Sequence, residues 1–493
     1  MPIADDLIRI AKGEILSDNW SKKIYSVDAS HYFITPELIT CPLDEYDVEK
    51  ICNYSFSKNI PITARGAGTG LLGQSLSKYI IIDFTKHMNN IIEMGTDYVI
   101  VQPGLCKGVL DKELKKKGRF LPPDPASSNY CTIGGMIANN SSGAHCLGYG
   151  NTIDFLEAIR VVYSDGRLGI VGDKNVKLDN KMTSLRRLLL PNVNLIQKHY
   201  PKVTKNSCGY RLDAVVSNQE FSPHKIFAAS EGTLGILTSA KMKIMDIPLY
   251  RHLLVLGFEN LLLATSAVPL ILKFLPVALE MLDYTAIHHT THAFQPPGST
   301  GCILFIEFAG DKIEEVERKY TDCGHKLSEK SVVLESATDE DSVIRIWNAR
   351  KNALNNITKL TVGSRKPIGL IEDTVVFPRL LHKYTQYLQQ LYFHYKLDFV
   401  MYGHVGSGNL HTRPLIDIDS QLETELIDHL ANIVFDRVIR SGGTITGEHG
   451  DGVARVKYIK HVYGKDVFSL FRRVKKIFDP KYTMNPGKKV IPS

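Results

Sequence analysis

Two histidines and one acid–histidine pair near the end of the chain are the residues best suited to chemistry. His404 and His411 lie seven residues apart in MYGHVGSGNLHTRP, and Glu448 precedes His449 in GTITGEHGDG. Two imidazoles and one carboxylate, with a coordination position left for substrate, form a catalytic set for zinc or a similar divalent ion. The alternative is that each histidine is a hydrogen-bonded structural residue, since motifs of single residues are weak.

The pair Glu448–His449 places a condition on the backbone. Adjacent residues of a regular strand point to opposite faces of it. Both side chains can face one site only where the backbone is irregular, and the flanking Gly447 and Gly450 permit that.

The glycine-rich stretch PITARGAGTGLLGQS, residues 61–75, is a second candidate site. It contains G-x-G-x-x-G, but a strand follows Ser77-Lys78 directly and leaves no room for the helix of a nicotinamide-binding βαβ unit. It is not a P-loop either, because Gln74 stands where a lysine is needed. Glycines that leave backbone N–H groups uncovered can still form a nest for a diphosphate, with charge from Arg65. A glycine-rich hairpin without a ligand is the other interpretation.

Two further segments favour a polar ligand. Residues 122–143, PPDPASSNYCTIGGMIANNSSG, are small and rich in hydroxyls and amides. Such residues bury little apolar area and pack poorly as core, so we expect this segment to surround a polar molecule. Residues 229–244, ASEGTLGILTSAKMKI, place two glycines around the start of a strand.

The elements that must position these residues form three stretches. Up to about Ile244, strands such as 79–84 and 98–104 alternate with helical pieces, which predicts an α+β domain. Beyond it, helical stretches such as 312–329 and 341–358 alternate with strands, which predicts an antiparallel sheet with helices. We therefore expect domains at 1–245 and 246–430, followed by a C-terminal segment at 431–493 that carries GEHGDG and NPGK.

Length and charge exclude some classes of protein. A chain of 493 residues is too long for one ordinary core, and 44% apolar with 23% charged residues is typical of a globular protein. The net charge of +7 is mild at this length. The densest basic runs, Lys115–Lys117 and Arg472–Lys476, are expected on solvated helix faces, so we predict no nucleic-acid partner.

Cysteine spacing and hydropathy bear on location. None of the eight cysteines forms a C-x-x-C pair, which argues against an iron–sulfur cluster held by this chain alone. The N-terminus lacks the apolar core of a secretory signal, and the most apolar stretch, Leu261–Leu272, is shorter than the ~20 residues of a membrane span. We expect a cytoplasmic protein with at most peripheral membrane contact.

Six segments in order, ARGAGTGL, PPDPASSNYCTIGGMIANNSSG, SEGTLGILT, GHVGSGNLH, GEHGDG and NPGK, resemble the flavin-dependent oxidoreductases of the vanillyl-alcohol oxidase type. They look most like the branch with D-lactate dehydrogenases, the glycolate oxidase FAD subunit and D-2-hydroxyglutarate dehydrogenase. The resemblance implies an α+β fold with a two-part FAD-binding domain, an antiparallel-sheet cap domain for substrate and a C-terminal segment that returns to the flavin. It implies noncovalent FAD, because His87 and His145 lie in no pattern for covalent attachment. The residues it places along FAD are Arg65, Gly66, Ala67, Gly68, Thr69, Gly70, Asp124, Ser127, Thr132, Gly134, Gly135, Asn139, Ser142, Gly143, Glu231, Gly235, Ile236 and Asn485.

The same resemblance implies roles for the late histidines. In that branch, His404, His411 and Glu448 match the ligands of a divalent metal, with zinc expected here, and His449 matches the catalytic base. One departure is Ser407, which stands where relatives usually carry an aspartate and which puts the strength of metal binding in doubt.

A carboxylate partner is implied at Arg350 in IWNARKNAL, which matches the family's W-x-x-R position. A guanidinium binds a carboxylate through two hydrogen bonds, although a surface ion pair on a helix is the alternative. Leu354 stands where a threonine is expected, which favours a small monocarboxylate such as lactate or glycolate.

The resemblance therefore implies an FAD-dependent dehydrogenase that oxidises a small D-2-hydroxy acid to the 2-oxo acid. The GEHGDG-x-x-R form, ending at Arg455, is similar to relatives that work with an iron–sulfur partner. We expect electrons to pass to a separate acceptor, such as an iron–sulfur subunit, a quinone or another carrier. Three alternatives remain open: a D-2-hydroxyglutarate dehydrogenase, a flavin-binding subunit of a glycolate oxidase-like complex, and a metal-dependent hydrolase whose glycine loops are structural.

Overall fold

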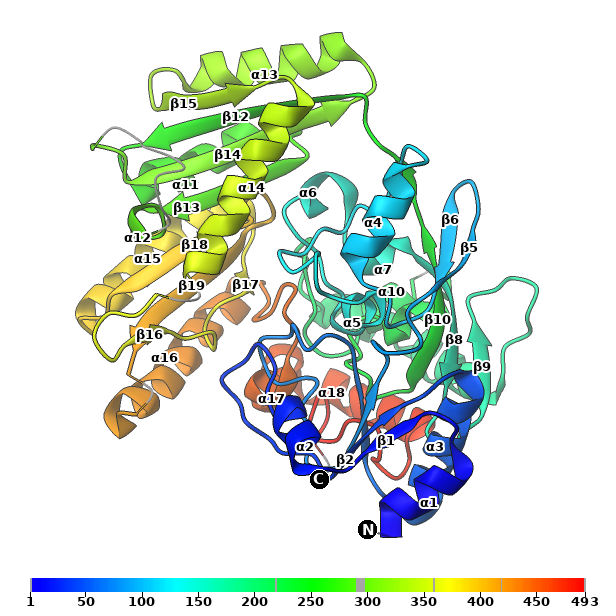
Figure 1. The fold of residues 1–493 in the computed structure, drawn as a ribbon. Coiled ribbons are helices and arrows are strands. Elements are labelled where there is room, and N and C mark those ends of the chain that lie inside the picture. Colours follow the sequence, from blue (N-terminus) through cyan, green and yellow to red (C-terminus); the bar gives the residue numbers. More distant parts are fainter. Residues whose placement is uncertain (1, 218–219, 290–297, 358–359, 418, 492–493) are drawn as a thin grey trace.

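The computed structural model describes residues 2–217, 220–289, 298–357, 360–417 and 419–491. We call residues 2–246 the first part, residues 250–440 the cap, and residues 441–491 the C-terminal return. Figure 1 shows the cap standing beside the first part, with the C-terminal return lying against the first part.

The smaller sheet of the first part is mainly parallel and buried. Three of its strands are parallel, and the first pairs antiparallel at one edge. The sequence IIID is buried along its whole length, as expected for a parallel strand covered on both faces. In sheet order the strands are β1 (Glu14–Leu16), β2 (Leu38–Cys41), β4 (Ile80–Asp83) and β3 (Ile62–Arg65), and the helices around them are α1 (Pro2–Ile10), α2 (Asn19–Tyr25) and α3 (Glu45–Lys58).

The second sheet of the first part is wholly antiparallel, and its central strand comes from late in this part of the chain. In sheet order its strands are β5 (Ile91–Met94), β6 (Tyr98–Val101), β10 (Ile236–Lys243), β8 (Leu156–Val162) and β9 (Leu168–Val171). A small pair is formed by β7 (Arg119–Phe120) and β11 (Met245–Asp246). The helices are α4 (Lys107–Lys115), α5 (Ile133–Asn139), α6 (Cys146–Tyr149), α7 (Thr152–Phe155), α8 (Asn180–Leu189), α9 (Val193–His199) and α10 (Leu212–Val215).

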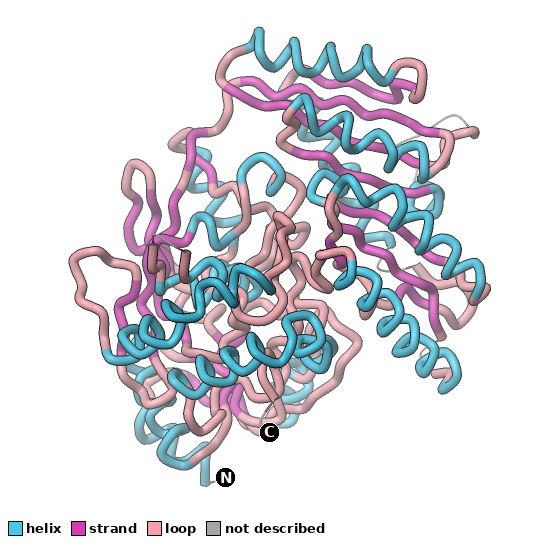
Figure 2. The backbone as a smooth tube through the Cα atoms, turned by 180° about the vertical axis from the view of Figure 1, so that it is seen from behind, coloured by secondary structure: helices cyan, strands magenta, loops and turns pink. Residues whose placement is uncertain are grey.

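The cap is built on one large antiparallel sheet with helices on both faces. Alternate residues of one strand enter different cores: Leu254 and Leu256 join the largest core cluster, whereas Leu253 and Val255 join another. In sheet order the strands are β15 (Val332–Ala337), β12 (Tyr250–Phe258), β14 (Cys302–Gly310), β13 (Ala278–Asp283), β18 (Phe399–Gly403), β19 (Asn409–Ile416) and β16 (Lys366–Pro367), with β17 (Thr374–Val375) also paired to β19. The helices are α11 (Leu261–Ile271), α12 (Tyr284–His289), α13 (Ile313–Leu327), α14 (Glu340–Ile357), α15 (Leu381–His394) and α16 (Gln421–Arg440), and Figure 2 shows helices lying along this sheet.

The C-terminal return closes the first part with α17 (Gly452–Arg455) and α18 (Ile459–Phe478). Beyond them, Met484 bridges Ile62 of β3, and the N–H of Asn485 donates to the Ile62 carbonyl at 2.8 Å. The expectation that the basic run 472–476 lies on a solvated face is wrong for Lys475. A run of five helical residues spans both faces, so Lys475 is buried and donates to the Thr233 and Met484 carbonyls.

Candidate functional site

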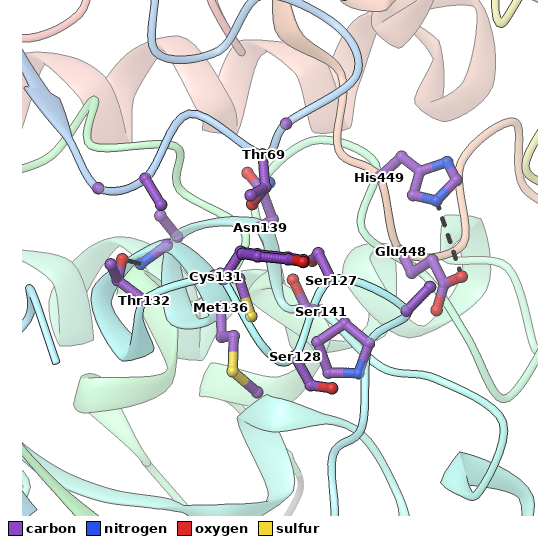
Figure 3. A pocket seen from close by; sticks show the side chains of 18 of the residues that line it. Thr69, Ser127, Ser128, Cys131, Thr132, Met136, Asn139, Ser141, Glu448 and His449 are labelled. Atoms are coloured by element: carbon purple, nitrogen blue, oxygen red, sulfur yellow. Dashed lines mark hydrogen bonds and ion pairs between the residues drawn. The ribbon is translucent and has the colours of Figure 1, made fainter. Parts of the chain in front are cut away.

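A cavity of about 890 Å³ lies between the first part and the cap. The glycine loop that follows β3 lines it on one side, and His404, His411, Glu448 and His449 line it on another. Figure 3 shows Glu448 and His449 across the cavity from Thr132 and Met136. The two candidate sites of the sequence are therefore one site.

The glycine loop offers unpaired backbone donors. In the described chain, no protein group accepts a hydrogen bond from the N–H groups of Gly66, Ala67, Gly68, Thr69 or Gly70. All five residues line the cavity. These residues are half-buried or exposed on the cavity wall, and five consecutive N–H groups without a protein partner there suit an anionic ligand such as a diphosphate.

Arg65 lies next to this loop and ties the end of β3 to the segment after α2. Its guanidinium donates to the Val27 carbonyl at 2.7 Å and to the Tyr25 carbonyl at 3.2 Å. A Cβ on Gly68 would lie 2.6 Å from that guanidinium, so glycine is required there for packing as well as for its φ of +68°. The charge of Arg65 thus lies beside the glycine loop, as expected from the sequence.

Most of the other expected cofactor residues also line the cavity. Gly143 and Asn485 do not: a Cβ on Gly143 would clash with Asp124, and the Asn485 side chain donates to the Gln74 and Glu231 carbonyls. The Glu231 carboxylate accepts from the N–H of Asp451 at 2.6 Å and thereby fixes the C-terminal return. Those on the cavity wall are Asp124, Ser127, Thr132, Gly134, Gly135, Asn139, Ser142, Glu231, Gly235 and Ile236.

The late histidines converge on one carboxylate oxygen. Glu448 Oε1 lies 2.8 Å from His404 Nε2 and 3.3 Å from His411 Nε2. Ligand atoms of these three residues all lie within 4.8 Å of one another, close enough to share one ion. The sequence predicted this convergence, but not that Ser142 and Lys205 of the first part would hold the other oxygen, Oε2, at 2.5 Å and 3.0 Å.

Two buried glutamates behind the histidines are absent from our sequence-based set. Glu280 on β13 accepts from His404 Nδ1 at 2.6 Å, and Glu372 accepts from His411 Nδ1 at 3.0 Å. Metal-binding histidines usually donate their other ring nitrogen to a carboxylate, which fixes the tautomer and leaves Nε2 free for a metal. This donor set therefore fits a divalent ion at His404, His411 and Glu448. Glu280 lies in an apolar strand and Glu372 in a loop beside Asp373, and neither belongs to a motif that we recognised, so only the fold brings them here.

Glu372 also orients His449. Its Oε1 lies 2.6 Å from His449 Nδ1, and His449 Nε2 lies 3.8 Å from Glu448 Oε1. Burial disfavours the charged imidazole, but the Glu372 carboxylate outweighs it and raises the pKa of His449 to about 9. The imidazoles of His411 and His449 stack at 4.9 Å.

The irregular backbone expected around Glu448 and His449 is confirmed. Gly450 has φ of +81°, and the Asp373 carboxylate accepts from the N–H groups of Gly447, Glu448 and His449 at 2.9 to 3.2 Å. One buried aspartate thus shapes the turn that presents both side chains to the cavity.

The structure gives Arg350 an internal partner. Its guanidinium is buried and pairs with Glu280, although the residue also lines the cavity. Ser407 is buried and donates to the His404 carbonyl at 3.0 Å, so it supports the ligand loop through the backbone. The Leu354 side chain lies outside the described residues.

A second polar cluster joins the two parts beside the cavity. His145 lies 2.6 Å from Asp124 and 3.1 Å from Glu307 of β14. Burial disfavours the imidazolium, but these carboxylates outweigh it and raise the pKa of His145 to about 10. Trp347 and Arg251 also donate to Glu307, at 2.5 Å and 2.8 Å.

Comparison with family models agrees with this geometry. An FAD binding domain matches residues 36–172, and the C-terminal domain of FAD linked oxidases matches residues 247–489. The chain belongs to the FAD-linked oxidase family. This confirms the expected family and the FAD cofactor, and a hydrolase with purely structural glycine loops does not fit it.

Individual relatives are 2-hydroxy-acid dehydrogenases and oxidase subunits by name. It is 29% identical to D-2-hydroxyglutarate dehydrogenase of Haemophilus influenzae, over 97% of this chain and 50% of that protein. It is also 29% identical to a glycolate oxidase subunit of Bacillus subtilis, over 99% and 96% of the two chains. The chain thus spans about half the length of the D-2-hydroxyglutarate dehydrogenases it matches.

A solved structure confirms the predicted fold class. The 4-ethylphenol oxidase of Gulosibacter chungangensis superposes with a TM-score of 0.70 at 14% identity, over 97% of this chain and 94% of that one. Within the described residues, no helix combines the length and apolarity that crossing a bilayer requires.

Proposed function

We propose that the chain is an FAD-dependent dehydrogenase that oxidises a small D-2-hydroxy acid of the D-lactate or glycolate type to the 2-oxo acid. One observation carries the proposal: the five unpaired N–H groups and the His–Glu cluster line the same cavity. A reaction that removes a proton and a hydride from adjacent atoms needs a redox cofactor and a base side by side.

FAD fits the side of the cavity lined by residues 66–70 and Gly232, which we call the first wall. Gly66 to Gly70 would bind its diphosphate through backbone N–H groups. Gly232 lines the cavity with φ of +68°, and the only atom within 4 Å of a Cβ added there is the Ala64 Cβ, at 3.9 Å. That space is open for a ligand. When bound, FAD would supply the acceptor for the hydride from the substrate's C2.

We call the side lined by His404, His411, Glu448 and His449 the second wall. The first three of these residues would hold a divalent ion, with zinc the expected one. Such an ion lowers the pKa of a bound hydroxyl and fixes its orientation. His449 would take the hydroxyl proton at Nε2, because its Nδ1 is already bound to Glu372. With its pKa raised to about 9, the neutral imidazole that can accept this proton becomes more abundant as the pH approaches 9. Arg350 stays a candidate for the substrate carboxylate only if its pairing with Glu280 is rearranged.

The relatives support this substrate class by their names alone. A second candidate is a flavin-binding subunit of a multi-subunit glycolate oxidase-like complex, which the near full-length match to the Bacillus subtilis subunit favours. A third is D-2-hydroxyglutarate oxidation, named for relatives about twice as long as this chain.

The visible spectrum of the purified protein tests the proposal. We expect a yellow protein that bleaches without oxygen on addition of D-lactate or glycolate and is reoxidised faster by a dye acceptor than by oxygen. L-lactate and D-2-hydroxyglutarate are the matched controls for configuration and chain length. A colourless protein after loading with FAD, or a flavin that no 2-hydroxy acid reduces, contradicts it.

Several expectations accompany this proposal. Electrons would pass to an iron–sulfur subunit or another carrier rather than to oxygen. The divisions near residues 245 and 430, the cytoplasmic location with at most peripheral membrane contact, and the lack of a nucleic-acid partner stay predictions.

A further inference from the structure

Arg413 lies on the same face of β19 as His411. The two are separated by one residue, and alternate residues of a strand share a face. On the neighbouring strand β18, Tyr402 pairs with His411, and its ring lies 5.8 Å from the Arg413 guanidinium. All three residues line the cavity. Arg413 therefore stands beside the metal-binding face, although no sequence motif marked it.

The guanidinium of Arg413 is buried but incompletely bonded. The residue is 7% exposed, and its Nε has no hydrogen-bond partner. Its nearest acid is Glu372, with Nη2 at 3.7 Å from Oε2, which is beyond hydrogen-bond distance. A buried guanidinium presents five N–H donors in a fixed fork, and leaving them unpaired is unfavourable. Because the residue lines the cavity, its guanidinium has bonding capacity that a ligand there can use.

The Glu372 carboxylate has enough hydrogen-bonded partners without Arg413. The same carboxylate already binds His411 Nδ1, His449 Nδ1 and the Arg455 guanidinium at 3.0, 2.6 and 3.3 Å. Arg350 Nε also lacks a partner, but the two arginines differ in what their acids depend on. The buried Glu280 has only Arg350 and His404 as hydrogen-bonded partners among the described residues. Moving Arg350 to a substrate would remove a main partner of a buried carboxylate, whereas moving Arg413 would not.

We propose that Arg413 binds the α-carboxylate of the substrate, an assignment that rests on the proposed function. The α-carboxylate is attached to the carbon that bears the reacting hydroxyl, so its cation must lie on the side of the site where His411 and His449 stand. Arg413 does so, through their shared neighbour Glu372. Every 2-hydroxy acid carries this group, so the interaction serves monoacids and diacids alike, while Arg350 remains with Glu280.

The test is anaerobic flavin reduction by Arg413→Gln and Arg413→Lys, with D-lactate, glycolate and D-2-hydroxyglutarate. Arg379→Gln, an exposed arginine of the cap, is the matched control and should behave as the unchanged protein. We expect Arg413→Gln to keep its flavin and to raise the substrate concentration for half-maximal reduction about 10- to 100-fold, the loss of one or two charge-assisted hydrogen bonds. Arg413→Lys should recover part of this, because a lysine keeps the charge but loses the fork.

The outcomes separate the two proposals. If the unchanged protein is reduced by no 2-hydroxy acid, the proposed function fails, and this assignment fails with it. If the unchanged protein is reduced and Arg413→Gln responds at the same concentrations, only the Arg413 assignment fails. A loss confined to the diacid also overturns it, since the contact would then be to a distal carboxylate. Should Arg413→Gln lose its flavin, Arg413→Lys decides: a half-maximal concentration unchanged from the parent refutes the contact, and a rise with normal flavin content supports it.

Discussion

The two walls of the cavity use different chemistry. The first wall presents backbone N–H groups from residues 66–70, and its side chains are small. The second wall presents charged side chains, each held by a buried partner: His404 by Glu280, and His411 and His449 by Glu372. Ligand binding by backbone N–H groups depends on the conformation of the loop, whereas binding and proton transfer by side chains depend on the identity of each residue. Substitutions should therefore have different effects: changes in the first wall should affect retention of FAD, and changes in the second wall should affect turnover.

The largest effect is expected at Glu448, where both metal-facing imidazoles meet. Glu448→Gln keeps the shape but removes the charge, and we expect the rate of flavin reduction to fall about 10³-fold or more, because a Lewis-acid metal supplies several kcal/mol. Flavin content should be unchanged. Reduction rate and the ratio of FAD to protein are measured together, with Glu425→Gln on the cap surface as control. Loss of FAD with normal reduction of what remains would contradict the division between the walls.

His449 should give the next largest effect. His449→Ala removes the base that Glu372 orients, and we expect flavin reduction to slow about 10²-fold or more while FAD and metal stay bound. Metal analysis and stopped-flow bleaching check this. A variant reduced at the parent rate would exclude His449 as the base.

The first wall should respond in the opposite way. A Cβ on Gly66 would lie 2.2 Å from Thr132 Oγ1, so Gly66→Ala must displace either the loop or the Thr132 side chain on the cavity wall. Overpacking of this kind costs about 1–3 kcal/mol, which predicts about 10- to 100-fold weaker FAD binding. Titration of the apoprotein with FAD measures it. Gly310→Ala in the cap, whose Cβ would meet Val316 at an ordinary 3.5 Å, should bind FAD normally, and equal weakening in both would refute the assignment.

The smallest effect is expected at His145, which joins the walls through Asp124 and Glu307. Its folded-state pKa of about 10 exceeds the ordinary 6.5, so its stabilisation is complete below pH 6.5 and disappears as the pH rises through 10. His145→Gln should lower the melting temperature by a few degrees at pH 6.5 and by much less near pH 10. Differential scanning calorimetry across this range provides the measurement. A loss that is constant with pH would show that the imidazolium is not involved.

Much of this fold follows from local patterns. The strands expected at 79–84 and 98–104 appear as β4 and β6, and the helices expected at 312–329 and 341–358 appear as α13 and α14. Short apolar runs that end at turns indicate strands, and apolar residues at helical spacing indicate helices. The order of the strands in the sheets could not be predicted from local patterns. β10, for example, pairs between β6 and β8 although it lies far from both in the sequence.

The candidate site likewise contains residues that sequence motifs predicted and residues that only the fold reveals. His404, His411, Glu448 and His449 stand among glycines in motifs, so their side chains were predicted to converge, and they do. Glu280 and Glu372 come from different segments of the cap and have no local signature. Arg413 had one signal, its spacing of two residues from His411 within a strand, but burial and the unpaired Nε appear only in the fold.

The most direct test of the account is a crystal structure of the protein loaded with FAD and a divalent ion. The account predicts diphosphate oxygens within hydrogen-bond distance of the N–H groups of Gly66–Gly70, the ion on His404, His411 and Glu448, and the flavin ring beside His449. An FAD molecule bound elsewhere, or a flavin ring separated from the histidines by protein, would contradict it.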